Sequence, residues 1–359
     1  MSSMIKQRDS YWDIVKGIGI VSIVIGHASW IIKVGDVSVS IGPFVYLYHL
    51  AVFFFCAGYL YNENMTDVGA YVIKRLKALY VPFVVYSFIW LVMRNLCLKI
   101  GILEGHVFSV SEHIIAITNI ITFNGVGEFL AAFWFLPVMF FSMCMYALCH
   151  AASSKCPGRW GHILRIIFCI LVGVTGAIIT DKQFGLLYNM QIAYLMLPVI
   201  EGGHCYRKYQ RIYPKWFTIL LCACSAGCLG LILCWDIGYI ELSRFMLISP
   251  AAFFPVTFIG IGFCLSLARI FSWNCFGKIF SYIGRHSFVI MAGHFLAMKL
   301  VDWCICVISG RTDGMSVFPH TFYSAWPVYY VAGVGLPLLL ECGYMKLRDV
   351  LGKNGQKQA

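Results

Sequence analysis

Two residues that could do chemistry lie in the first apolar segment of the chain, Lys16 and His27. They are eleven positions apart, which is three turns of an α-helix to within about 20°, so a helix places both side chains on one face. At about 1.5 Å per residue, the cation and the imidazole are separated by roughly 16 Å along the helix axis. An ionisable side chain inside a spanning helix is costly and marks a functional site. The pair therefore predicts a reaction site in this segment.

His27 is the candidate general base of that site. A neutral imidazole accepts a proton near neutral pH, so it could take one from an acceptor hydroxyl. The alternative is a histidine bonded to a carbonyl of a neighbouring helix, with Gly17 and Gly19 serving close helix packing. Asp13 lies three residues before Lys16 and is expected to pair with it, because a lone buried cation is costly.

The composition predicts a membrane protein. Hydrophobic residues make up 60% of the chain and charged ones 12%, and the mean hydropathy is +0.79. We expect an all-α, polytopic protein with about ten transmembrane helices, because apolar runs of the required length recur along the whole chain. Residues 1–348 are expected to form a single transmembrane domain and residues 349–359 a polar cytoplasmic tail. The predicted spans are 14–33, 40–61, 79–98, 129–150, 163–180, 185–201, 215–235, 248–271, 286–309 and 322–346.

Lysine and arginine predict the orientation of these spans. With both termini in the cytoplasm, every inner segment carries more of these residues than the outer loops beside it, as the positive-inside rule requires. The net charge of +11 therefore follows mostly from topology, and basic patches anchor to anionic headgroups. We expect an inner (plasma) membrane protein with no nucleic-acid partner. The outer loops carry only Lys33, Lys99, Lys182, Arg244 and Arg311.

The cysteines do not indicate a metal site, and the N-terminal apolar segment does not indicate a cleaved signal peptide. Most of the 16 cysteines lie in apolar runs, where cysteine behaves as a small hydrophobe. Pairs such as Cys222 with Cys224 have the wrong spacing for a zinc site, so no metal is expected. The first segment resembles a signal peptide, but Asp13 and Lys16 interrupt it and no cleavage site follows, so we expect it to remain as a helix.

Several segments carry a resemblance to a known family, the type-three acyltransferases (acyltransferase 3). A basic residue and a histidine separated by ten intervening residues, here Lys16 and His27, are one of its features, and the others occur in order between about residues 8 and 300. The chain looks closest to the branch grouped with fucose 4-O-acetylases. The remaining matching segments are His49–Leu60, Lys74–Pro82, Phe133–Leu136, and Ser281–Phe288 followed by His294.

The resemblance implies an enzyme, an acyl-CoA-dependent O-acyltransferase that modifies glycans and other acceptors. It implies acetyl-CoA as cytoplasmic acyl donor, no permanently bound cofactor, and as acceptor a hydroxyl of a cell-surface glycan or its lipid-linked precursor. His27 would be the base, and Asp13 would orient Lys16. The donor phosphates would contact Lys16 and a basic inner loop made of Lys74, Arg75 and Lys77. The same loop could instead serve only as a topogenic anchor.

Two departures from the family pattern affect the donor site. Lysine at position 16 gives a point charge rather than a bidentate fork, although the family pattern allows either residue. In the second motif, Arg75 is present but the expected arginine three residues later is Ala78. Lys74 with Lys77, or Arg75 with Lys77, could compensate.

Acceptor binding is predicted for four residues, His49, Glu128, Trp134 and His294. Glu128 and Trp134 border the membrane after a long outer loop, about 99–128, that carries polar and aromatic residues. The alternative for this loop is a solvated segment with an amphipathic stretch in the interface. Plain packing is the alternative for both histidines.

Two other functions remain open at this level. A transporter or exporter of a glycan or lipid could line its pathway with Lys16 and His27, although no resemblance between the first and last five helices supports the repeats typical of such folds. An acyltransferase acting on a small non-glycan acceptor is the other alternative.

Overall fold

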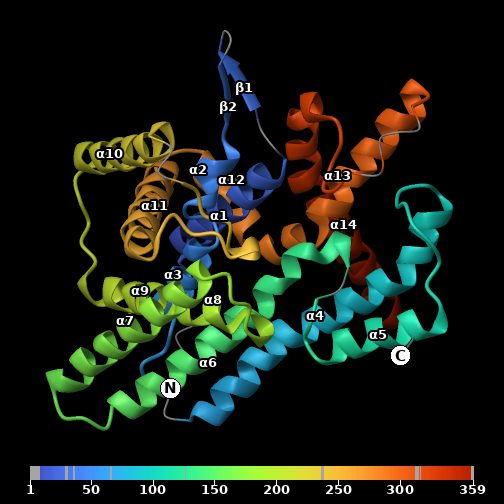
Figure 1. Cartoon of the computed structure of the whole chain (residues 1–359). Coiled ribbons are helices and arrows are strands. Elements are labelled where there is room, and N and C mark those ends of the chain that lie inside the picture. Colours follow the sequence, from blue (N-terminus) through green and yellow to red (C-terminus); the bar gives the residue numbers. More distant parts are fainter. Residues whose placement is uncertain are drawn as a thin grey trace. The chain divides into compact units, whose positions relative to one another are not determined.

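A computed structural model of the chain describes residues 9–28, 31–34, 37–64, 67–125, 127–235, 238–311, 315 and 317–356. It is almost entirely α-helical (Figure 1). The chain forms two compact units, each assembled from three segments. Unit 1 comprises Met1–Ile23, Pro43–Arg75 and Val138–Ser287, and unit 2 comprises Val24–Gly42, Leu76–Pro137 and Phe288–Ala359. The single domain over 1–348 stays a prediction.

Within the described residues, eight helices are long and apolar enough to cross a membrane. This confirms an all-α, multi-span membrane protein. Each of the eight overlaps one of the predicted spans, because a run of about 20 apolar residues is a strong signal for a spanning helix. The eight are Gly42–Tyr59, Val68–Lys99, Glu128–Ser153, Arg159–Asp181, Lys215–Cys234, Pro250–Phe271, Ser287–Ser309 and Tyr323–Asp349.

The first predicted span is a helix with a different end. Helix α1 covers Ser10–His27 and stops there rather than at residue 33. The chain then forms a hairpin in which β1 (Ile31–Val34) pairs antiparallel with β2 (Val37–Ser40), and Ile31 stands opposite Ser40. Short β-branched runs of this kind favour strands, and the hydropathy scan did not separate them from the preceding helix.

The predicted span 185–201 is broken and runs further than expected. It consists of a 3₁₀ turn (Leu187–Asn189), α8 (Met190–Leu195) and α9 (Leu197–Tyr209), with a bend at Met196 just before Pro198. Its middle residues are almost fully buried. This segment is therefore a core element of unit 1, where α9 packs against α3 and α8 against α7 (Figure 1).

Glycine contacts set two of the close helix approaches in unit 1. A Cβ on Gly284 of α12 (Phe276–Arg285) would collide with the carbonyl of Asp13 in α1, and one on Gly17 would collide with the carbonyl of Phe280. The same reciprocal arrangement joins α3 (Ala51–Tyr59) to α9. Small residues allow such close backbone approach in membrane helices, so Gly17 has the packing role that the sequence analysis gave as an alternative.

In the described part of the chain, unit 1 contains five further helices. They are α2 (Gly42–Tyr46), whose first residue belongs to unit 2, α6 (Phe135–Ser153), whose first three residues belong to unit 2, α7 (Arg159–Asp181), α10 (Lys215–Cys234) and α11 (Pro250–Phe271). A 3₁₀ turn, η3 (Leu242–Arg244), precedes α11. Helix α10 packs against α11.

Unit 2 contains most of α4 (Val68–Lys99), then α5 (Val110–Ile121), the 3₁₀ helix η1 (Glu128–Trp134), α13 (Ser287–Ser309), η4 (Tyr323–Ala325) and α14 (Trp326–Gln356). Helix α5 lies in the outer loop, for which an amphipathic stretch was the alternative interpretation, and its first turn is fixed by a capping box between Ser109 and Glu112. Helix α14 continues into the segment predicted as a tail.

Candidate active site

His27 is the last residue of α1 and lies half-buried in unit 2. Its ring stacks on that of His294, with centroids 5.4 Å apart and planes inclined by 27°. The His27 ring also meets the ring of Phe295 at 4.7 Å, and Phe295 packs on His294 at 4.1 Å. The two histidines are far apart in sequence, so the ninth predicted span supplies a direct neighbour of the candidate base. The prediction that His294 binds the acceptor stays a prediction.

His294 is fully buried in α13. Its Nδ1 atom lies 2.9 Å from the carbonyl oxygen of Met291 and 3.1 Å from that of Ile290. These contacts assign the proton to Nδ1, because a carbonyl can only accept. Nε2 then carries the lone pair, and within the described part of the chain it has no hydrogen-bond partner. The imidazole can therefore accept one further proton or hydrogen bond.

A buried ion pair lies further along the same helix. Lys299 and Asp302 are 3% and 0% exposed, and Nζ of the lysine is 3.3 Å from Oδ2 of the aspartate. Asp302 also accepts hydrogen bonds from the Thr321 amide and the Tyr329 hydroxyl, and Lys299 donates to the carbonyl of Met315. These bonds tie the segment before α14 to α13.

This tie places a third histidine close to the first. His320 stacks on Tyr329 at 4.3 Å, and the carbonyl groups of His27 and Ala28 lie next to its ring. Burial lowers the pKa of His320, although Asp302 and those carbonyls favour its protonated form. His320 is therefore set against the end of α1 as a neutral group.

The predicted pair of Asp13 and Lys16 is confirmed in unit 1. Nζ of Lys16 is 2.8 Å from Oδ1 of Asp13, and the lysine side chain is 22% exposed against 4% for the aspartate. Asp13 also packs through its carbonyl against Gly284, so α12 fixes the turn of α1 that carries the pair. The ammonium can thus meet a ligand while the carboxylate stays covered.

The basic inner loop is not a loop. Lys74, Arg75 and Lys77 lie in the first turns of α4, which starts at Val68, because no residue there breaks the helix. Both lysines are exposed, whereas Arg75 is half-buried with its guanidinium 4.8 Å from the Tyr71 ring. Arg75 therefore differs from the two lysines, because its guanidinium packs on a ring of its own helix.

A group of aromatic and basic side chains continues from Arg75. Tyr61 packs on Tyr71 at 5.5 Å and on His204 at 5.9 Å. Its carbonyl accepts a hydrogen bond from Nη1 of Arg207 at 2.7 Å. Several cationic or imidazole groups thus converge around one tyrosine of unit 1.

Glu63 partly balances this positive group. Its Oε1 lies 2.8 Å from Nε2 of His204. Burial acts to raise the pKa of Glu63, but His204 and Arg165 outweigh it and lower the pKa, so the carboxylate is ionised. The carboxylate is half-exposed and could be exchanged for another anion.

A second buried ion pair supports this region. Arg165 and Glu201 are about 95% buried and bond through Nε and Oε2 at 2.8 Å, and Tyr146 donates to the same carboxylate. The sequence analysis did not select either residue. The signal was present, because both are charged residues in apolar runs, as Lys299 and Asp302 are, and that same criterion had selected Lys16.

The other predicted acceptor residues are dispersed. His49 lies in unit 1 at the break between α2 and α3, 5% exposed, with Nδ1 2.9 Å from the Val45 carbonyl. Glu128 and Trp134 begin and end η1 in unit 2. Glu128 lines a pocket, and Trp134 is not among the residues that line it. Among the described residues, no group of three or more His, Cys, Asp or Glu side chains could hold a metal ion.

Comparison with known proteins gives the class of this molecule. A family described as an acyltransferase domain, Acyl_transf_3, matches residues 9–342, which is nearly the whole chain. The chain therefore belongs to the acyltransferase 3 family and is a membrane acyltransferase. Searches of curated proteins and of solved structures returned no significant match. The match does not separate branches of the family, so the relation to fucose 4-O-acetylases stays a prediction.

Proposed function

We propose that this acyltransferase is an O-acetyltransferase that moves an acetyl group from cytoplasmic acetyl-CoA to a hydroxyl of a cell-surface glycan or its lipid-linked precursor. The stacked pair of His27 and His294 carries the proposal. It offers an imidazole at the end of α1 beside a second imidazole whose Nδ1 is already committed to carbonyl groups. Family membership favours this enzyme over the transporter alternative.

In the proposed reaction, His27 takes the proton of the acceptor hydroxyl. The oxygen attacks the thioester carbonyl, the carbon–sulfur bond breaks, and the coenzyme A thiolate leaves with the acetyl group now on the acceptor. The imidazolium of His27 returns its proton to the thiolate or to water. His294 orients the His27 ring, and its Nε2 lone pair favours the protonated form.

For the donor, we propose that the cations of unit 1 hold the phosphates. Lys16 supplies an ammonium that is partly exposed, and Arg75, His204 and Arg207 gather near Tyr61. Charge-assisted hydrogen bonds to phosphate are the strong ones. Lys74 and Lys77 then contribute long-range attraction from the surface of α4. This arrangement assumes the predicted orientation, with both termini in the cytoplasm of an inner (plasma) membrane protein.

The test is acetyl transfer by the full-length protein in lipid nanodiscs, with radiolabelled acetyl-CoA and a membrane glycan fraction. A general base contributes roughly 10²–10⁴-fold, so His27→Gln should lower the transfer rate at least 100-fold with acetyl-CoA affinity unchanged. His113→Gln, an equivalent change in α5 outside the site, should leave the rate at the wild-type value.

Three results would contradict parts of this proposal. Turnover of His27→Gln above about a tenth of the wild-type rate excludes proton abstraction by His27. Label recovered only on small metabolites or peptides would favour the non-glycan acceptor. Movement of glycan across the membrane without any transfer of label would favour a transporter.

A further inference from the structure

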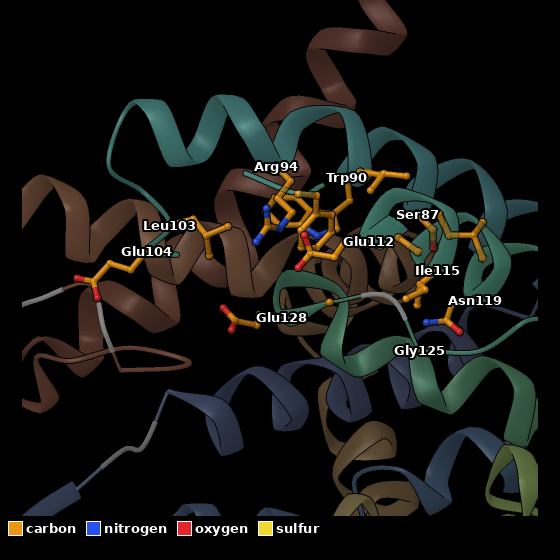
Figure 2. A pocket seen from close by; sticks show the side chains of 15 residues that line it. Ser87, Trp90, Arg94, Leu103, Glu104, Glu112, Ile115, Asn119, Gly125 and Glu128 are labelled. Carbon is orange, nitrogen blue, oxygen red and sulfur yellow. The ribbon is translucent and has the colours of Figure 1, made fainter. Parts of the chain in front are cut away.

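A separate pocket lies within unit 2, between α4, α5, the chain that connects them and the start of η1 (Figure 2). Its volume is about 420 Å³, within the range of about 300–1,000 Å³ typical of sites for small organic ligands. We call it the α4–α5 pocket. Its polar lining includes Ser87, Arg94, Glu104, Asn119 and Glu128.

Two of its charged residues already have partners that hold the wall in place. Arg94 lies 3.5 Å over the Phe108 ring and donates from Nη1 to the His106 carbonyl at 2.9 Å. Glu112 accepts from the Ser109 amide and lies 2.7 Å from Nε2 of His106. The Ser109 amide and the His106 side chain lower the pKa of Glu112 to about 2. The wall therefore exists before any ligand arrives.

Ser87 is the observation that points to a ligand. Its side chain is 1% exposed and lines the pocket, yet its Oγ has no hydrogen-bond partner in the described part of the chain. Helical serines in apolar surroundings usually donate to the carbonyl four residues earlier, and Ser142 and Ser266 do so here. Buried hydroxyls are normally satisfied. The Ser87 hydroxyl is thus available to a group inside the pocket.

The remaining polar groups define which ligand would fit. Glu104 and Glu128 are exposed at the pocket, and among the described residues neither makes an ion pair or a side-chain hydrogen bond. Ionised carboxylates accept hydrogen bonds and repel anions. The side-chain amide of Asn119 adds one donor group and one acceptor. The pocket therefore favours a ligand rich in hydroxyl or ammonium donors and without negative charge.

The apolar residues of the lining further restrict the class of ligand that fits the α4–α5 pocket. Trp90 is 8% exposed and packs against Phe129 at 4.5 Å, so its ring is held rigidly at the pocket wall (Figure 2). Leu91 and Ile115 extend this apolar surface. A ligand ring with apolar faces and hydroxyl groups at its edge matches this wall. Its apolar face can lie on the indole of Trp90, which has an apolar body and a polar tip, and its edge can reach the polar side chains.

We infer that the α4–α5 pocket binds a non-anionic sugar residue, neutral or amine-bearing, and selects against acidic sugars. The sugar hydroxyls bond to Glu128 and Ser87, one face of the ring lies on Trp90, and Glu104 adds negative charge at the edge of the pocket (Figure 2). The identification of this sugar as part of the acceptor rests on the proposed function. The prediction that the pocket binds such a sugar does not depend on that function.

The experiment measures binding without any acyl donor. Full-length protein in nanodiscs is applied to an array of immobilised neutral, amino and uronic sugars. Wild-type protein should retain neutral or amino sugars at least fivefold over uronic ones. Glu104→Gln with Glu128→Gln should lose at least fivefold of that retention and reduce the discrimination. Ser87→Ala should weaken retention without changing the discrimination. Asp349→Asn, the same charge change on an exposed carboxylate of α14, should match wild type.

Retention of no sugar, stronger retention of uronic sugars, or unchanged retention by the Glu104→Gln, Glu128→Gln variant would overturn the inference. Acetyl transfer measured on the same preparations separates it from the proposed function. If the pocket variants transfer acetyl groups at the wild-type rate, the α4–α5 pocket does not bind the acceptor of the reaction. If wild-type protein retains sugars but transfers no acetyl group, the proposed function is wrong and the sugar-binding inference stands.

Discussion

The buried pair of Lys299 and Asp302 gives a prediction whose size follows from its surroundings. Asp302→Asn keeps the shape and an acceptor oxygen for the Thr321 amide and the Tyr329 hydroxyl, but it removes the negative charge. Lys299, 3% exposed, then keeps only carbonyl partners such as that of Met315. Removing one partner of a buried pair costs about 3–5 kcal/mol.

We expect a value near the lower limit, about 3 kcal/mol, because the carbonyl groups still accept from the ammonium. For a unit of 150–250 residues each kcal/mol corresponds to about 2–4 °C in Tm, so Tm should fall by about 6–12 °C. A thiol-reactive dye can report the transition in purified protein, because unfolding of unit 2 exposes the buried Cys97 and Cys306.

Two controls make the result specific. Lys299→Met combined with Asp302→Asn removes both charges and should recover part of the lost stability, since no buried charge is left uncompensated. Asp349→Asn, whose carboxylate is 65% exposed beside Arg348, should stay within about 0.5 kcal/mol. A Tm of Asp302→Asn within about 2 °C of wild type would refute the reasoning and mean that the pair is solvated.

Three further predictions concern the donor cations, the α1–α12 contact and His320. Lys74→Ala, Arg75→Ala and Lys77→Ala together should weaken acetyl-CoA binding at least tenfold, chiefly because the charge-assisted contact of Arg75, about 1.5–3 kcal/mol, is lost; equilibrium binding measures this. Gly284→Val should destabilise unit 1 by several kcal/mol, roughly 3 or more, because its side chain meets the backbone of α1; a melting curve measures this. The pKa of His320 is held below its ordinary value by burial, so wild type should lose stability as pH falls below about 6.5, and His320→Phe should show a flatter pH dependence of Tm.

A specific result would contradict each of these three predictions. Unchanged acetyl-CoA affinity in the triple variant would leave the start of α4 as an anchor only. A Gly284→Val protein with wild-type Tm would mean that α1 and α12 separate readily. For His320, the sign is fixed: a histidine with a lowered pKa stabilises the fold above its unfolded pKa, and this contribution is lost as pH falls. A gain in stability toward pH 5.5 in wild type alone would contradict its burial as a neutral group.

Local sequence patterns sufficed for several conclusions. Apolar runs of about 20 residues predict spanning helices because only a helix satisfies its own backbone in lipid, and eight of the predicted spans are such helices. The pairing of Asp13 with Lys16 followed from helical periodicity. The ordered motifs also predicted the family, which the match over residues 9–342 confirms.

Local patterns failed where the backbone changes course. The end of α1 at His27 and the following hairpin were missed, because the apolar run continues across both. The basic residues near the start of α4 read as a loop, whereas an exposed polar turn continues a helix equally well. The bend at Met196 is set by the packing of α8 and α9 in unit 1.

Only the tertiary structure decided which residues share a site. His294 stacks on His27 although the two are far apart in the sequence, and Arg165 meets Glu201 across two helices. Such contacts depend on how closely helices approach, which glycine positions and side-chain shape set together. The sequence by itself determined the class of protein and one candidate base; the folded chain determined the partners of that base, because those partners lie on helices that only packing brings together.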